Sequence, residues 1–423
     1  MPFLFQRSLP FVFAATAFFA AAPVFCTPHI VITGELEKTG KTSVSISKIS
    51  GASQTVGEFT AIVESDLKRS GRFAVVKDTQ SASAVISGEI AQNSEQCRAT
   101  ITLTTLAGTR KTEWTHTFPA TPDKLRDAAH ALSDFITEKI TGAPGMASSK
   151  ILFTGRANNG NPEIYQCDAD GARLRRITQD NAICLSPKWF HNQNAFLYTS
   201  WHSGPPAVYK VGMDNNRREL VAGHTGMNQG ATPSPDGSRM AVVFSKSGGI
   251  DLWLQHLDGQ KNPDGSPKST RLTATKSFIE ASPSWSPDGK NIVFTGGEGG
   301  ASPALHTMSL ADKKPARLFR LSSVNESISP DWGANNLIAF CGRSGGRYKI
   351  YTIKPDGSGL TLASPDDDAN YEDPSWAPNG RHIICTKTVN YKKSLVILDT
   401  GGDAPLPLLA FSGDSYMPNW SKK

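Results

Sequence analysis

The chain has 423 residues, with 44 Lys and Arg against 38 Asp and Glu, 6 cysteines and 38% hydrophobic residues. A formal net charge of +6 over this length is too small to indicate nucleic-acid binding. The composition also excludes a collagen, a coiled coil, a disulfide mini-protein and a polytopic membrane protein. At ~150 residues per domain, the length predicts two or three domains unless one repeat fold absorbs most of it.

Residues 1–26 have the pattern of a secretory signal peptide. Arg7 precedes an apolar run from Leu9 to Phe19, and small residues follow. The run is shorter than the ~20 residues that a membrane-spanning helix needs. We therefore expect an exported chain that is soluble once the signal peptide is removed, with cleavage near Thr27. Lipidation of Cys26 is the weaker alternative.

The cysteines and histidines give no metal or cofactor signal. The five cysteines after Thr27 are odd in number, scattered and without CxxC spacing, which predicts neither a disulfide framework nor a zinc site. We expect most of them to be small buried residues, and a single disulfide bond remains an alternative. The nine histidines are dispersed. The cysteines are Cys97, Cys167, Cys184, Cys341 and Cys385.

Residues 27–145 are predicted to form a small mixed α/β domain. Apolar residues recur at helical spacing from Phe59 to Leu67, and Gly71 follows as a stop. A second helix is predicted from Thr121, as N-cap, to Gly142. Its buried stripe should be Leu125, Ala129, Leu132, Ile136 and Ile140. Strands are expected at Ile30–Ile32, Val44–Ser47, Phe73–Val76, Ala84–Ile90, Ala99–Leu106 and Glu113–Phe118.

After residue 145 the helical spacing disappears. Short apolar runs alternate with Asp-Gly, Gly-Gly and Pro-Asp-Gly turns, which is typical of hairpins. The segment SPSWSPDG at Ser282–Gly289 recurs in degraded forms, and each copy carries about four strands in ~45 residues, the signature of a propeller blade. The Trp column of the repeat is Trp189, Pro233, Trp285, Trp332, Trp376 and Trp420.

Six copies predict a six-bladed β-propeller in residues 146–423. Two strands, beginning at Ile151 and Glu163, precede the first Trp copy, and Met417–Ser421 follow the last complete blade. We therefore expect the C-terminal segment to supply the innermost strand of the blade that starts at Ile151. This arrangement would close the ring without a disulfide.

The Trp and Pro residues of the repeat are expected to serve packing and turns. The residues just before each Pro enter the innermost strand and should face the mouth of the central channel. This mixed set suits a protein or peptide ligand better than a single metal ion. The candidate partner-binding residues are Asn228, Gln229, Glu280, Ile328, Tyr371, Glu372 and Tyr416.

Three kinds of motif in the sequence do not predict catalysis or a cofactor. Gly34–Thr42 has five residues between its glycines where a P-loop has four. Gly342–Gly346 satisfies G-x-S-x-G, but a further strand follows where a hydrolase needs a helix. Asp168–Gly171 and Asp366–Asp368 lack the other ligands of an EF-hand, so they are interpreted as turns, with loose calcium binding left open.

The leader, the α/β domain and the six SPxWSPDG-type repeats together resemble the TolB family, the periplasmic subunits of Tol–Pal systems. Asp66–Phe73 and Glu138–Gly142 also look like the family. The resemblance implies a non-enzymatic, monomeric periplasmic adaptor that supports outer-membrane integrity and cell division. Its propeller would receive the lipoprotein Pal, and its N-terminal arm would engage TolA. The residues of this arm are Thr27, Pro28, His29, Ile30, Val31, Ile32, Thr33 and Gly34.

Two other functions remain as alternatives. An exported glycan- or peptidoglycan-binding propeller is suggested by the Trp-rich repeats, and it requires exposed Trp side chains, whereas we expect them to be buried. A propeller hydrolase or lyase would need acid and base groups in the channel, where Glu280 and Glu372 are the obvious candidates.

Overall fold

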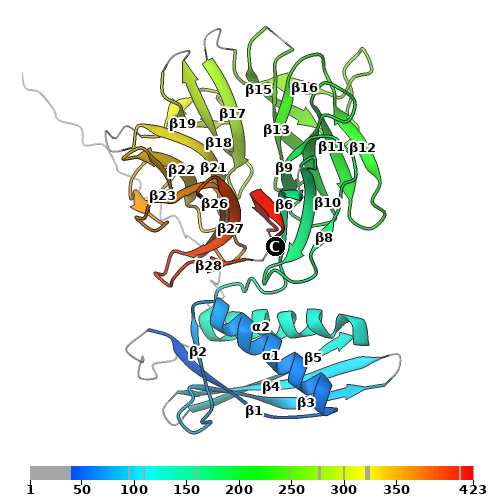
Figure 1. The fold of residues 1–423 in the computed structure, drawn as a ribbon, viewed down its shortest axis with the longest axis vertical. Coiled ribbons are helices and arrows are strands. Elements are labelled where there is room, and N and C mark those ends of the chain that lie inside the picture. Colours follow the sequence, from blue (N-terminus) through cyan, green and yellow to red (C-terminus); the bar gives the residue numbers. More distant parts are fainter. Residues whose placement is uncertain are drawn as a thin grey trace, which may run out of the picture.

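The computed structural model describes residues 40–422 except 94–95, 108–109, 158–159, 247, 275–277, 299–300, 320–323 and 409–410. The predicted signal peptide and the arm Thr27–Gly34 lie outside the described residues. A small mixed α/β unit comes first, and a six-bladed β-propeller follows (Figure 1). Of the helices in this described part, none combines the length and the apolar character needed to cross a bilayer.

The first unit is a five-stranded sheet covered by two helices on the face that turns toward the propeller (Figure 1). The strand order is β2-β1-β3-β4-β5, with β1 parallel to both of its neighbours. The elements are β1 (Thr42–Ser50), α1 (Ser53–Arg69), β2 (Phe73–Val76), β3 (Ala84–Gln92), β4 (Cys97–Ala107), β5 (Arg110–Ala120), the 3₁₀ turn η1 (Pro122–Lys124) and α2 (Leu125–Thr141).

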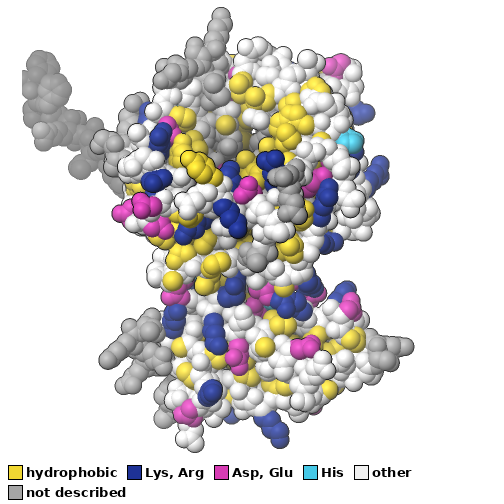
Figure 2. Space-filling view, viewed as in Figure 1, with side chains coloured by type: hydrophobic (Ala, Val, Ile, Leu, Met, Phe, Trp, Pro, Cys, Tyr) yellow, Lys and Arg dark blue, Asp and Glu magenta, His cyan; other side chains and the backbone are white. Residues whose placement is uncertain are grey.

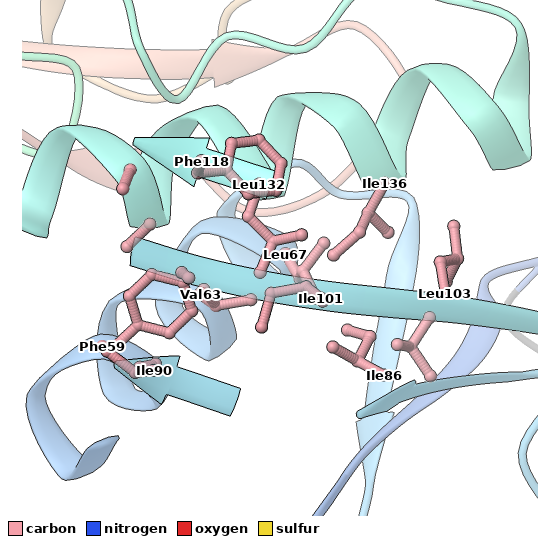
Figure 3. Close-up of a cluster of buried hydrophobic side chains, with 14 of the residues drawn as sticks. Phe59, Val63, Leu67, Ile86, Ile90, Ile101, Leu103, Phe118, Leu132 and Ile136 are labelled. Atoms are coloured by element: carbon pink, nitrogen blue, oxygen red, sulfur yellow. The ribbon is translucent and has the colours of Figure 1, made fainter. Parts of the chain in front are cut away.

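The core of this unit lies between the helices and the sheet (Figure 3). Helix α1 contributes Phe59, Val63 and Leu67, which are at most 1% exposed. All five residues of the predicted α2 stripe are buried, which confirms the helical spacing found in the sequence. Each large apolar side chain so buried contributes about 1.5–3 kcal/mol. Gly142 ends α2 in the left-handed conformation at φ 69°.

The start of α2 differs from the prediction. Thr121 precedes the 3₁₀ turn rather than the α-helix, and its side chain makes no capping hydrogen bond. The α-helix itself begins at Leu125. Pro122, with its fixed φ and missing N–H, favours a tight first turn, which here takes 3₁₀ geometry before the helix continues.

The propeller consists of six four-stranded blades, numbered here from the first strand after the linker. From the innermost strand outward, blade 1 is β29 (Gly413–Trp420), β6 (Lys150–Ala157), β7 (Glu163–Asp168) and β8 (Arg175–Arg176). Blade 2 is β9 (Cys184–Trp189), β10 (Ala195–Ser200), β11 (Ala207–Gly212) and β12 (Arg218–Ala222). Blade 3 is β13 (Asn228–Pro233), β14 (Arg239–Phe244), β15 (Asp251–His256) and β16 (Ser269–Arg271). Blade 4 is β17 (Phe278–Trp285), β18 (Asn291–Glu298), β19 (Ala304–Ser309) and β20 (Ala316–Arg317). Blade 5 is β21 (Glu326–Trp332), β22 (Ile338–Ser344), β23 (Arg347–Ile353) and β24 (Thr361–Leu362). Blade 6 is β25 (Asn370–Trp376), β26 (His382–Val389), β27 (Lys392–Asp399) and β28 (Leu406–Pro407).

The ring closes as predicted. The C-terminal strand β29 pairs with β6, with Trp420 opposite Ile151 and Tyr416 opposite Thr154. The five cysteines after Thr27 are all buried and free, so the described residues contain no disulfide. Gly342–Gly346 runs from β22 into the turn before β23, which is a hairpin rather than a catalytic strand-to-helix elbow.

Candidate functional site: the propeller channel

Each innermost strand carries a β-bulge at the residue before the first Pro of the repeat. In blade 3, which has Ala231 in place of this Pro, the bulge is at the equivalent residue. At each bulge the register shifts and the backbone takes a positive φ, between 49° and 63°. A bulge bends the strand and re-aims the following side chains, so the repeat bends all six strands around the axis in the same way. The bulged residues are Ser186, Gly230, Ser282, Ser329, Asp373 and Met417.

Just before the bulge, side chains alternate between the channel and the packing between blades, as the pleat of a strand requires. Two steps before the Pro position, every blade has a half-buried residue: Leu185, Gln229, Ala281, Ile328, Glu372 and Tyr416. Three steps before it, every blade has a buried residue: Cys184, Asn228, Glu280, Ser327, Tyr371 and Ser415. The first set, called here the mouth ring, is therefore the set available to a ligand.

The seven predicted site residues divide between these two sets. The mouth ring contains Gln229, Ile328, Glu372 and Tyr416, while Asn228, Glu280 and Tyr371 are buried. The amide of buried Asn228 donates to three main-chain carbonyl oxygens, including that of His224 at 2.6 Å, and so holds its own loop. Adjacent residues in a strand point to opposite sides, and the sequence prediction did not separate them.

The mouth ring lies at the end of the channel away from the first unit. Strand β29 runs from Gly413, opposite Ala157, to Trp420, opposite Ile151, and Lys150 at the start of β6 contacts the first unit. The starts of the innermost strands therefore lie at the other end, together with the turns between second and third strands. A ligand at this mouth would not have to displace the first unit.

Glu372 is the one ionisable carboxylate in the mouth ring. Burial raises its pKa above the ordinary value, the neighbouring Asp373 raises it further, and Lys393 lowers it. The ammonium of Lys393 also lies 4.9 Å from the ring centroid of Tyr416. The remaining members are largely apolar, so the ring offers an apolar rim with one polarised acid.

Deeper in the channel, residues of all six blades line a cavity of about 110 Å³. Two ionisable groups line it, Lys188 and Asp373. Burial lowers the pKa of Lys188, partly offset by Asp331 and Asp373, and burial raises the pKa of Asp373. Lys422, near the C-terminus, pairs with Asp331 at 2.8 Å.

A hydrogen-bonded belt joins four of the six seams between blades. In each, the main-chain N–H of the repeat's Trp donates to the side chain that follows the Pro in the preceding blade. The pairs are Trp189 to Asn419 Oδ1 (2.8 Å), Trp332 to Ser284 Oγ (3.0 Å), Trp376 to Asp331 Oδ2 (2.7 Å) and Trp420 to Ser375 Oγ (3.0 Å). At the seam between blades 2 and 3, Lys188 cannot accept a hydrogen bond and Pro233 cannot donate one.

The opposite end of the propeller is joined to the first unit by ion pairs around one buried carboxylate, that of Asp168. Asp168, 1% exposed, accepts hydrogen bonds from Lys150 (2.8 Å) and Arg173 (2.7 Å) and lies 3.5 Å from Arg126 of α2. Arg173 also pairs with Asp127 of α2. Burial alone would raise the pKa of Asp168, but Lys150 and Arg173 outweigh it and lower the pKa. Figure 2 shows charged side chains of both signs at the narrow waist between the two units.

A second contact joins the first unit to blade 6. Arg381 donates to the carbonyl oxygen of Gly71 (3.1 Å) and to Asp399, and Lys41 pairs with Asp403 at 2.7 Å. Lys41 immediately precedes β1, so this contact fixes the beginning of the first described strand against the propeller.

One group in the described residues has the geometry to hold a metal ion: His130, Asp168 and Asp170. It coincides with the waist, where Arg126 pairs with both carboxylates and Lys150 and Arg173 pair with Asp168. These cations already neutralise the acids. The Asp168–Gly171 segment is a hairpin turn, with the N–H of Gly171 donating to the carbonyl oxygen of Asp168 at 2.9 Å.

Known proteins resemble the chain in sequence and in fold. A family model described as the TolB beta propeller domain matches residues 137–423. A TolB homolog of Chlorobium luteolum is 28% identical over 308 residues, which is 72% of this chain and 67% of that protein. The Tol-Pal system protein TolB of Alcanivorax borkumensis is 30% identical over 228 residues, 48% of this chain and 52% of the relative. The crystal structure of TolB from Acinetobacter baumannii has the same fold, with a TM-score of 0.78 at 22% identity, over 90% of this chain and 97% of that one. The chain therefore belongs to the TolB family of β-propeller proteins.

Proposed function

We propose that the chain is a non-enzymatic periplasmic adaptor of a Tol–Pal system, which binds Pal at the mouth of the propeller and TolA through Thr27–Gly34. Through these partners it would support outer-membrane integrity and cell division, as a monomer that is peripheral to the membranes. Membership of the TolB family and a relative named as a Tol–Pal protein support the role.

The observation that carries the mouth assignment is the half-buried mouth ring. An apolar rim around one desolvated carboxylate, Glu372, resembles the core of a protein interface more than a catalytic site. The glycan alternative is disfavoured, because the five Trp side chains of the repeat are at most 7% exposed. The hydrolase alternative is disfavoured as well, because it needs two acidic groups that face the same ligand. Glu280 is buried, and of the two candidates only Glu372 is in the mouth ring.

The test uses Glu372→Arg combined with Tyr416→Ala. Charge reversal and loss of the aromatic side chain should weaken binding to the soluble domain of Pal at least about ten-fold, while the unfolding midpoint changes little. The matched control is Glu219→Arg combined with Leu220→Ala, on the exposed outer strand β12. Equal affinity of the mouth variant and the unmodified chain would contradict the assignment.

A second experiment addresses the arm. Lys41, near the first described residue, pairs with Asp403 of blade 6 at the contact between the two units. Deleting Thr27–Gly34 should abolish the contact with TolA and leave Pal binding intact. Loss of both partners to the same extent would refute the proposed division of roles.

A further inference from the structure

We propose that Tyr391, at the tip of the β26–β27 hairpin, is an aromatic anchor that extends the mouth ring outward and inserts into an apolar hollow of the protein bound there. This inference rests on the proposed function, because it takes the occupant to be the same partner, Pal. It adds a second contact point on blade 6, outside the channel.

The first observation is exposure at the correct end of the propeller. Tyr391 is 97% exposed and Val389, two residues earlier, is 48% exposed. Their hairpin joins the second and third strands of blade 6, so it lies on the same end as the mouth ring. A tyrosine exposed to this extent, with an exposed neighbour, presents apolar surface that the described residues leave almost uncovered. Tyrosine is enriched among the residues that dominate interface energetics.

The second observation is backbone strain that the neighbouring blade avoids. Asn390 and Tyr391 have φ values of 48° and 64°, as in a type I′ turn. Blade 5 has the same two-residue turn, with Gly345 and Gly346 at φ 57° and 81°. Glycine adopts this conformation without steric cost, whereas a bulky residue does not. Blade 6 therefore places a tyrosine where the fold favours glycine, and strain of this kind clusters at functional sites.

The third observation is a groove beside Tyr391, at the same end of the propeller as the mouth ring. A cavity of about 570 Å³ lies between the hairpin and the loop before β25, lined by Tyr391, Val389, Asp368 and Lys387 among others. On its inner side Lys387 pairs in register with Tyr371, the residue next to Glu372. The groove therefore lies along β26, the strand next to the one that carries Glu372, and reaches the hairpin tip.

The acidic residues beside the hairpin indicate which side chains the partner should present next to its apolar hollow. Asp367 is bound by Lys349 and Lys387 and by the hydroxyl of Tyr371. Asp368 in contrast is exposed and makes no ion pair with another described residue. We therefore expect the partner to present a Lys or Arg next to the hollow that receives the tyrosine ring.

The test is Tyr391→Gly, which copies the turn of blade 5. The variant should lose affinity for the soluble domain of Pal about ten-fold or more, with an unfolding midpoint equal to or above that of the unmodified chain. Tyr391→Phe, which keeps the ring, should bind within about three-fold of the unmodified chain. Leu220→Ala, an exposed apolar residue on β12, is the control for non-specific surface loss.

The outcomes separate this inference from the proposed function. If Glu372→Arg with Tyr416→Ala weakens binding but Tyr391→Gly binds as the unmodified chain does, the anchor is wrong and the mouth assignment stands. If the unmodified chain does not bind Pal, both are wrong. If Tyr391→Gly binds weakly but also unfolds at a markedly lower temperature, the turn is structural and the anchor is again wrong.

Discussion

The two ends of the propeller use carboxylates in opposite ways. At the waist, Asp168 is buried and fully paired with cations from both units, and its pKa is lowered. At the mouth, Glu372 is half-buried, its pKa is raised, and it makes no ion pair with another described residue. The charges of the first end are therefore satisfied within the chain, whereas the carboxylate at the second end has no such pairing among the described residues.

The largest effect is expected from Asp168→Asn. The substitution keeps the shape but leaves Lys150, Arg173 and Arg126 without their shared partner, and removing one member of a buried ion pair costs about 3–5 kcal/mol. The free energy of unfolding, measured with a denaturant, should fall by this order. Asp214→Asn, at an exposed acid, is the control and should change it by no more than about 0.5 kcal/mol. A loss as small as that of the control would show that the waist is not held by these charges.

Acidic pH should weaken the contact between the two units at the waist. The pKa values of Asp168 and Asp127 lie below the ordinary value of 3.8 in the folded chain. A group with a lowered folded pKa contributes stability above its unfolded pKa and loses it as the pH falls through the folded pKa. The waist should therefore stay intact from neutral pH down to about 4, and the protection of the α2 amides, measured as hydrogen exchange relative to the intrinsic rate at the same pH, should fall only below 3.8. A loss of this protection already near pH 6 would contradict this account.

An intermediate effect is expected at the seams between blades. Ser375 is fully buried and accepts the main-chain N–H of Trp420, so Ser375→Ala strands a buried donor and should cost about 1–3 kcal/mol in unfolding free energy. Lys188→Met, at the seam between blades 2 and 3, should be neutral or stabilising, because burial already disfavours the ammonium. Equal losses in both variants would mean that the belt does not stabilise the ring.

The smallest effect on stability is expected at the mouth. Glu372→Gln removes a carboxylate that burial already disfavours, so the unfolding free energy should stay within about 0.5 kcal/mol or rise. Both Glu372→Gln and Asp168→Asn replace a carboxylate by an amide, so the difference between their unfolding free energies compares the two ends directly. A cost comparable to that of Asp168→Asn would remove the distinction.

Much of the fold could be predicted from the sequence because it depends on short-range patterns. The SPxWSPDG repeat fixes the bulge, the turn and the buried Trp of each blade, and the α2 stripe has an unbroken helical spacing. Ring closure followed from counting strands before the first Trp and after the last. The 3₁₀ start of α2 could not be predicted, because Thr121 and Pro122 are equally compatible with a capped α-helix.

The site was only partly predictable. A strand's two faces differ by one residue, so Gln229 and Asn228 look alike in sequence although only Gln229 lies in the mouth ring. The belt could have been found by aligning the repeats. The position after the Pro usually holds a side chain that accepts a hydrogen bond, and the Trp position supplies the N–H. Lys188 and Pro233, which meet at one seam, both depart from this pattern. The waist had none, because Asp168 and Arg126 are distant in sequence and meet only through the packing of the two units.

The most direct test of the central claim is site-specific photo-cross-linking in intact cells. A photoreactive residue at position 416, in the mouth ring, should capture an outer-membrane lipoprotein identified as Pal by mass spectrometry, while one at position 214, on blade 2, should not. Capture of Pal at 214 and not at 416, or of no protein at 416, would contradict the account.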